Sequence, residues 1–215
     1  MRHVKLLSAL VFMALTFMLS LPLSAESCNA FAPPKLPNLD NIPATLSYPP
    51  KTKVMLGKLS IELERTPLGI AQRSAGTGVI QHRGDAADSE DLLCFTTGFG
   101  LQPQRIWFSS GELGGSQRII DAFYASVSEA AVMDSRFCPE LPQRLHPVSI
   151  GKLWLGASQE KLKGWLGKPS AKRDGWWLYS YAGKVNQDFD EVEIVGVRIV
   201  RGKVVAIFAS KSTTN

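Results

Sequence analysis

The chain has 215 residues, 45% of them hydrophobic, and its 24 basic and 19 acidic residues give a formal net charge of +5. No block of like charges and no Lys/Arg stripe occurs, which argues against nucleic acid or an anionic membrane surface as the partner. The apolar content at this length is sufficient for one or two packed cores.

Residues 1–25 differ from the rest of the chain. Arg2 and Lys5 form a short positive start, an apolar run follows, and Pro22 and Ala25 mark its end. This layout predicts a signal peptide cleaved near Ala25, and therefore a periplasmic or secreted protein. The alternative is an uncleaved anchor, but the run falls short of the roughly 20 apolar residues of a spanning helix. Glu26 lies close before Cys28 and argues against a lipid anchor there.

Residues 26–51 are predicted to form a proline-rich extended arm. The stretch 33–50, PPKLPNLDNIPATLSYPP, holds six of the thirteen prolines. Proline fixes φ and lacks a backbone donor, so we expect an extended segment outside any sheet. The folded body is expected to start near residue 52.

Residues 52–127 are predicted to form a first helix-plus-sheet repeat. Its helix is expected within GKLSIELERTPLG (57–69), although Pro67 would shorten or distort it. Strands are expected at 91–97 and 105–113, with an outer strand at 119–126. The Gly/Ala/Asp-rich stretch 76–90 is expected to be an exposed loop.

Residues 128–149 are predicted to be a connector, and 150–215 a second repeat. Ser158 can cap a helix that ends at Gly167, with Pro169 behind it and an apolar stripe of Leu162, Trp165 and Leu166. A short helix is unstable alone and must pack on something. Three strands are expected to supply that surface as an antiparallel meander, at 175–181, 191–200 and 203–210.

The two repeats are linked by matches at one constant offset. Ser60 corresponds to Ser158, Glu62 to Glu160, Leu68 to Leu166 and Gly69 to Gly167. These matches favour an internal duplication. The predicted fold class is α+β, with two tandem units, each a short helical segment packed on an antiparallel β-meander.

The three cysteines are Cys28, Cys94 and Cys138. Export makes disulfides possible. Cys94 and Cys138 lie in sequence expected to be ordered, whereas Cys28 lies in the arm, so we expect a Cys94–Cys138 bridge with Cys28 free. Such a bridge should stabilise the fold by roughly 4 kcal/mol. The alternative is three reduced, buried thiols.

The second repeat resembles a known family. Gly156, Ser158, Leu162, Leu166, Gly167 and Pro169 fit G-x-[ST]-x-x-x-[VL]-x-x-x-L-G-x-P, and Trp177, Tyr179 and Tyr181 fit the strand pattern W-x-Y-x-[FY]. These residues are similar to the small lipoproteins of the outer-membrane β-barrel assembly machinery. The tandem arrangement resembles the secreted β-lactamase inhibitory proteins, in which two such units form a curved sheet. The resemblance implies this fold, and its motifs specify a fold more than a function. The chain lacks the lipid-attachment cysteine, and its cysteines do not suggest one disulfide per repeat.

Catalytic and metal-binding patterns are few. No HExxH, GxSxG, GxxxxGK[ST], CxxC or GxGxxG motif occurs. His146 is expected to lie in a linker. His82, with its acidic neighbours, is expected in a solvated loop without the spacing of metal ligands. We therefore expect a non-enzymatic protein without a metal or cofactor.

The aromatic residues of the last repeat are the candidate binding residues. In the strand 175–181, Trp177, Tyr179 and Tyr181 share one face, and Phe95 continues that face from the first repeat. One side of this strand must cover the helix, and the other needs a different neighbour. We expect Phe95, Trp177, Tyr179 and Tyr181 to form an exposed surface that binds another protein; the alternative is a packed core.

These observations predict an exported protein-binding module of the cell envelope. Its partner would be another envelope protein or an exported enzyme, with the module acting as a scaffold or as a hydrolase inhibitor. The alternative is an enzyme or small-molecule carrier whose site the sequence does not reveal.

Overall fold

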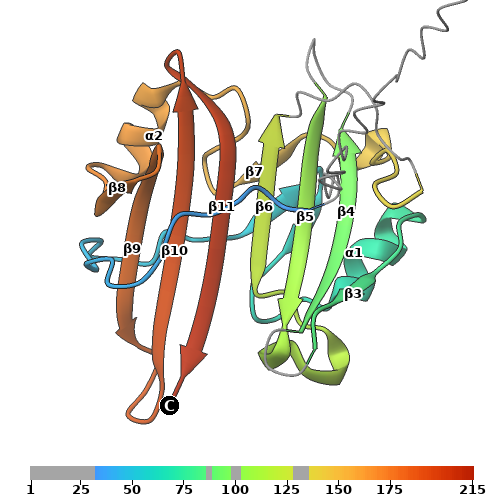
Figure 1. The fold of residues 1–215 in the computed structure, drawn as a ribbon, viewed down its shortest axis with the longest axis horizontal. Coiled ribbons are helices and arrows are strands. Elements are labelled where there is room, and N and C mark those ends of the chain that lie inside the picture. The colour runs from blue at the N-terminus through green and yellow to red at the C-terminus, as the bar shows by residue number, and fades with distance from the viewer. Residues whose placement is uncertain (1–31, 86–88, 98–102, 128–135) are drawn as a thin grey trace, which may run out of the picture.

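The computed structural model describes residues 32–85, 89–97, 103–127 and 136–215. Within these ranges the protein is a mixed α+β fold of antiparallel sheets with few helices (Figure 1). No helix in the described ranges is both long and apolar enough to cross a membrane. The predicted signal peptide and Cys28 lie outside these residues.

A small sheet and a large sheet contain all the strands described. The small sheet has the order β2-β1-β7, with β1 at Val54–Leu56, β2 at Leu59–Ile61 and β7 at Val148–Ile150. The large sheet has eight strands in the order β3-β4-β5-β6-β11-β10-β9-β8. Its strands are β3 (Gln81–Arg83), β4 (Glu90–Thr97), β5 (Gln104–Gly111), β6 (Ala122–Val127), β8 (Ala171–Arg173), β9 (Trp176–Lys184), β10 (Asp190–Val200) and β11 (Lys203–Thr214).

The pairing of β6 with β11 joins the two halves of the large sheet. Ala206 faces Ser126 at one end of this pairing, and Ser210 faces Ala122 at the other. The predicted strands at 91–97, 175–181, 191–200 and 203–210 are confirmed. The strand expected at 119–126 exists as β6, but it lies at the centre of the sheet and not at its outside.

The second helix forms as predicted. It spans Gln159–Leu166 (α2), and the Ser158 hydroxyl accepts a hydrogen bond from the Lys161 N–H at 3.2 Å. Gly167 ends it with a φ of 72°. Leu162 and Leu166 are buried, as the apolar stripe requires.

The position predicted for the first helix is wrong. Residues 59–61 form β2, and the helix α1 spans Leu68–Ala75, so Leu68 begins a helix that it was expected to end. Pro67 explains the difference, because it lacks a backbone N–H and its φ of −66° suits the position before the first helical turn. Part of the loop expected at 76–90 also pairs with β4 as β3.

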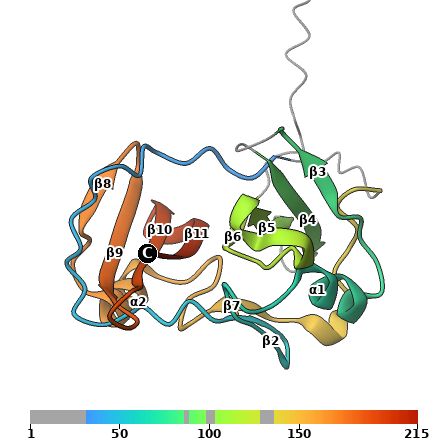
Figure 2. The ribbon, with the colours of Figure 1, turned by 90° about the horizontal axis from the view of Figure 1, so that it is seen from below.

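One face of the large sheet carries the main core. Both helices and the small sheet lie on this side (Figure 2). Phe95 and Tyr179 are each 0% exposed within this core, so the prediction that they form an exposed surface is wrong. Burial raises the pKa of the Tyr179 hydroxyl to about 12. Trp177 and Tyr181 lie on the same side and are partly buried.

The arm crosses the other face of the sheet. It runs over β11, β10 and β9, passes around the β8 edge and returns toward β2 on the helix side (Figures 1 and 2). Leu36, Leu39 and Ile42 pack on a second cluster that includes Trp176 and Phe208. The arm is therefore part of the folded body and not a separate linker.

The predicted pairing of Cys94 with Cys138 is confirmed. Cys94 on β4 is bonded to Cys138, with a Cα–Cα distance of 4.7 Å. The segment after Cys138 lies alongside β4, because the Thr96 N–H donates to the Pro139 carbonyl at 2.9 Å and the Leu141 N–H donates to the Thr96 carbonyl at 2.8 Å. Both cysteines pack with Trp107 on the arm side of the sheet.

Candidate binding pocket

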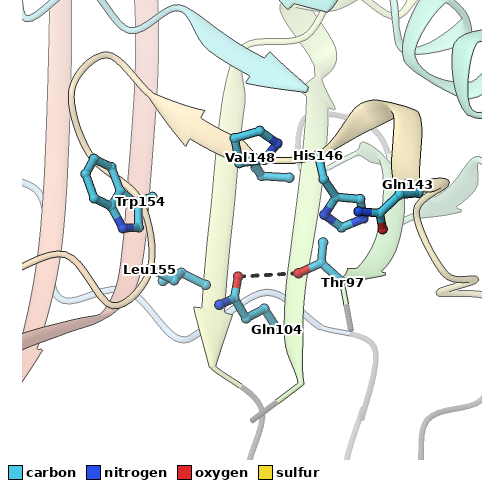
Figure 3. A pocket seen from close by; sticks show the side chains of 8 residues that line it. Thr97, Gln104, Gln143, His146, Val148, Trp154 and Leu155 are labelled. Atoms are coloured by element: carbon cyan, nitrogen blue, oxygen red, sulfur yellow. Dashed lines mark hydrogen bonds between the residues drawn. The ribbon is translucent and has the colours of Figure 1, made fainter. Parts of the chain in front are cut away.

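A pocket opens on the helix side where the two halves meet (Figure 3). Its volume is about 370 Å³. The end of β4, the start of β5, the short helix Gln143–Leu145 (η3), β7 and the loop after β7 all contribute to it. The lining residues are Thr97, Gln104, Gln143, His146, Pro147, Val148, Trp154 and Leu155.

The loop after β7 holds Trp154 at the edge of this pocket. Ile150 and Leu153 exchange two backbone hydrogen bonds of 2.8 Å, which close a tight turn at Gly151. On the other side of Trp154, the Gly156 N–H donates to the Val204 carbonyl at 2.8 Å. The loop is thus attached to β7 before the tryptophan and to β11 after it.

Glycine is required at the tight turn. Gly151 has a φ of 52°, which favours glycine, and a Cβ atom there would overlap the indole of Trp165 from α2. The β7 turn and α2 therefore approach each other more closely than a side chain at residue 151 would allow.

Trp154 is partly exposed to solvent, but its neighbours hold its side chain in place. It is 42% exposed, whereas the neighbouring Leu155 is buried. The Lys161 ammonium lies 4.2 Å from the centre of the Trp154 ring, a cation–π contact that limits the positions the indole can take. Figure 3 shows Trp154 and Leu155 on one side of the pocket and His146 and Gln143 on the opposite side.

The polar groups of the pocket are uncharged amides, a hydroxyl and one imidazole. Thr97 donates from its hydroxyl to Oε1 of Gln104 at 3.3 Å (Figure 3). This contact turns the Gln104 amide nitrogen away from Thr97, toward the Leu155 side. Nε2 of His146 lies 3.0 Å from the Leu141 carbonyl oxygen, which fixes the ring. The pocket lining includes no Asp, Glu, Lys, Arg or Cys among the residues described.

The four tryptophans that cluster in the sequence have four different environments. Trp154 lines the pocket, Trp165 packs against Gly151, and Trp176 is buried under the arm. Trp177 lies between two ammonium groups, with Lys172 at 4.0 Å and Lys163 at 5.9 Å from its ring centre.

None of the residues predicted to bind a partner lines the pocket. Phe95 and Tyr179 belong to the core, and Trp177 and Tyr181 lie on β9 away from it. The sequence reasoning missed Trp154 as a site residue. The signal that could have found it is a large aromatic residue in a loop between Gly151 and Gly156, where no strand or helix period requires burial.

Two of the acidic residues near His82, Glu90 and Asp91, are paired with arginines. Nδ1 of His82 lies 3.2 Å from Asp91, Arg118 lies 2.9 Å from Asp91, and Arg83 lies 2.7 Å from Glu90. Among the described residues, no group of three or more His, Cys, Asp or Glu side chains is placed to hold a metal ion. Asp88 lies outside the described ranges.

Comparison of the chain with known protein families, with curated proteins and with solved structures finds no match.

Proposed function

We propose that this protein is an exported, non-enzymatic binding module that receives an apolar group of a partner protein in the pocket at the junction of its halves. The observation that carries the proposal is Trp154, which is 42% exposed yet held by a doubly attached loop and by the Lys161 ammonium. Rigid, partly exposed tryptophans at the rim of a pocket are typical anchors of protein interfaces.

The chemistry of the pocket favours an uncharged apolar guest. Leu155, Val148 and Pro147 supply apolar surface, and the uncharged groups of Gln104 and Gln143 can hydrogen-bond its polar end. A charged guest would lose hydration without gaining an opposite charge. A leucine, methionine or aromatic side chain of a partner would suit these walls.

A small-molecule carrier is the second candidate, and the pocket volume is the observation in its favour. A volume of about 370 Å³ lies within the roughly 300–1,000 Å³ of typical ligand sites. The guest would again be neutral and mostly apolar.

Export remains part of the proposal. Residues 1–25 have the layout of a cleavable signal peptide. The Cys94–Cys138 disulfide supports it, since such bonds persist in oxidising compartments such as the periplasm or the extracellular space. The partner would then be an envelope protein or an exported enzyme, for which the module serves as a scaffold or an inhibitor.

We also propose that the two halves are tandem copies of one unit. In support, α1 is followed by β3 to β6, and α2 by β8 to β11, with each set forming a four-stranded antiparallel meander. The two sets meet through their last strands. Gly76 and Gly167 each follow the last residue of a helix with a φ of 72°, although their ψ values of 11° and −136° differ. Their common place favours a different alignment of the copies from the one that paired Gly69 with Gly167. The resemblance to the assembly-machinery lipoproteins and the β-lactamase inhibitory proteins belongs to this proposal.

The test is affinity capture from the envelope fraction and the culture medium with wild-type protein, Trp154→Ala and Tyr48→Ala. Tyr48 is a matched control because it is an aromatic residue, 82% exposed, that does not line the pocket. We expect one stoichiometric partner with wild type and with Tyr48→Ala, and at least a tenfold weaker capture with Trp154→Ala.

Thermal unfolding of all three proteins checks that Trp154→Ala stays folded. Equal capture by Trp154→Ala and wild type would show that the pocket does not carry the interaction. A small molecule found in the wild-type protein by native mass spectrometry, and absent from Trp154→Ala, would favour the carrier.

A further inference from the structure

The arm sits on the sheet in the manner of a bound peptide. Leu36, Leu39 and Ile42 are each partly buried against the cluster of Trp176, Leu178 and Phe208. They are spaced by three residues and accompanied by prolines. The backbone turns between the second and third of them, at residues 40 and 41, where Asn41 has a left-handed φ of 53°. All three apolar side chains therefore contact the same cluster.

The polar contacts of the arm are made almost entirely to its backbone. One guanidinium, that of Arg173 on β8, donates to three carbonyl groups of the arm, those of Asn38 at 2.9 Å, Asp40 at 2.6 Å and Asn41 at 3.2 Å. The Ser180 carbonyl on β9 accepts the backbone N–H groups of Thr45 and Leu46, both at 3.1 Å.

A single direct contact between polar side chains adds to these, the Thr45 hydroxyl with that of Ser170 at 2.6 Å. Backbone contacts are the same for any sequence. This surface therefore recognises a backbone that turns after its second apolar residue, with apolar residues at every third position. Asn41 favours the left-handed φ of that turn, and most other exposed side chains of the arm are free to vary.

The arm is attached to the body at one end of this surface. Pro50 is buried, and the Thr52 hydroxyl donates to the buried Glu193 at 3.1 Å, so the chain is fixed where the arm joins the body. Lys35, Asp40 and Pro43 remain exposed along the arm. When the arm leaves the face of Trp176, the main core on the opposite side of the sheet loses one partly buried arm residue, Leu46.

We propose that the face across β11, β10, β9 and β8 is a peptide-binding site, which the arm occupies within its own chain. The ligand class is a proline-containing segment of a partner protein with apolar residues at positions i, i+3 and i+6 and with Asn or Gly at i+5, where the backbone turns. Such a segment replaces the arm, with Arg173 and the Ser180 carbonyl binding its backbone. The proposal does not depend on the pocket of Trp154, which lies on the helix side of the sheet.

The test uses the full chain with Leu39→Asp and Ile42→Asp, which disengage the arm by placing charges on the apolar cluster. Three fluorescent peptides are titrated. The first is the arm sequence PPKLPNLDNIPATL, and the second is PPALPALANIPAAL, which keeps the prolines, the apolar positions and the asparagine of the turn. The third carries the two aspartates in place of Leu39 and Ile42.

We expect the first two peptides to bind with dissociation constants within about threefold of each other, because their backbones and apolar spacing are the same. The third peptide should bind at least tenfold more weakly. Adding Arg173→Ala to the variant should weaken the first two by at least tenfold. The wild-type chain should also bind them weakly, since its own arm competes at the high effective concentration of a tethered segment.

Three results would overturn the proposal. Binding of the arm sequence alone would make the surface specific to its own arm. Dimerisation of the wild-type chain through exchanged arms, seen by light scattering, would make a second copy the occupant. Binding of no peptide to a folded variant would make the arm a purely structural strap.

If the variant does not fold, hydrogen exchange in the wild-type chain provides a second test of the proposal. A millimolar excess of PPALPALANIPAAL should accelerate exchange of the Thr45 and Leu46 amides, which lose the Ser180 carbonyl when the arm leaves. Unchanged exchange at both amides would contradict the proposal.

Discussion

Gly151 determines how closely the Trp154 loop approaches α2. A Cβ atom at residue 151 would overlap the Trp165 ring, and the φ of 52° adds backbone strain for any other residue. Gly156, at the other end of the loop, has a φ of 88° but no atom within 4 Å of the position of a Cβ. A substitution at Gly156 therefore tests backbone strain alone, whereas a substitution at Gly151 tests strain together with steric overlap.

We predict that Gly151→Ala lowers the free energy of unfolding by about 2–4 kcal/mol, the sum of strain and overpacking. Gly156→Ala should cost only the strain, about 1–2 kcal/mol. Urea denaturation followed by tryptophan fluorescence measures both. Equal losses for the two variants would mean that Trp165 moves aside at little cost.

Strand alternation predicted which aromatic residues share a side, but not what covers that side. Phe95, Trp177 and Tyr179 do lie on one side of the sheet, as the period of two implies. Because β6 pairs with β11, that side is the same in both halves, and both helices cover it. No local sequence feature indicates that β6 pairs with β11. The sequence pattern therefore did not determine which side of the sheet is exposed.

At the scale of elements, the β10–β11 pair contains a partly buried ion network. The Lys211 ammonium lies 2.6 Å from Glu191 and 3.2 Å from Glu193, whose side chain is 6% exposed. Burial lowers the pKa of Lys211, but the hydrogen bonds that its ammonium donates to Glu191 and Glu193 outweigh this effect, and the pKa is raised above its ordinary value of 10.5.

We predict that Lys211→Met lowers the free energy of unfolding by about 3 kcal/mol near neutral pH, because it leaves a buried carboxylate without its cation. Lys184→Met is the control, since its ion pair with Asp190 is largely exposed and should contribute less than about 1 kcal/mol. Denaturation of both variants beside wild type measures the difference.

The pH dependence follows from the raised pKa of Lys211. The folded protein holds this proton more tightly than the unfolded chain does, so the stabilisation is complete below pH 10.5 and is lost as the pH rises through the folded pKa. The difference in the free energy of unfolding between wild type and Lys211→Met should therefore be constant from pH 7 to 9.5 and become smaller above pH 9.5. A gap that widens with alkaline pH would contradict this assignment.

The two helices differ in how well local sequence specifies them. α2 has a capping Ser158, an apolar stripe and a closing glycine, and it was predicted within one residue. α1 begins after Pro67 without a side-chain cap, so its start has only the weaker signal of proline before the first turn. The matches of Ser60 and Glu62 with the α2 cap placed the helix too early, in residues that pair with β1 instead.

At the scale of the whole molecule, the path of the arm could not be predicted. Proline content predicts an extended backbone, and residues 33–39 are indeed outside helix and strand. Where the arm lies depends on Arg173 and Trp176, more than a hundred residues away in sequence, which form a surface only after the sheet has assembled. The pocket could not be predicted for the same reason, because its walls come from β4, β5 and the β7 loop, which meet only in the folded protein.

The pairing of β6 with β11 also determines whether the halves unfold together. Phe123 and Ala125 from β6 and Ile207 and Ala209 from β11 belong to the same core cluster as residues of both helices. A body of this size with one continuous core is below the length at which cores usually divide. We therefore expect one cooperative unit.

We predict that the most protected amides of β4 and β9, in opposite halves, have equal opening free energies in native-state hydrogen exchange. Ile207→Ala, at a side chain 2% exposed on β11, should lower both by the same amount, about 2–4 kcal/mol. Val200→Ala, at a side chain 47% exposed at the end of β10, should change neither by more than about 0.5 kcal/mol. If Ile207→Ala lowered the value for β9 and left that for β4 unchanged, each half would have an independent core, and β6–β11 would be an interface between two separately stable units.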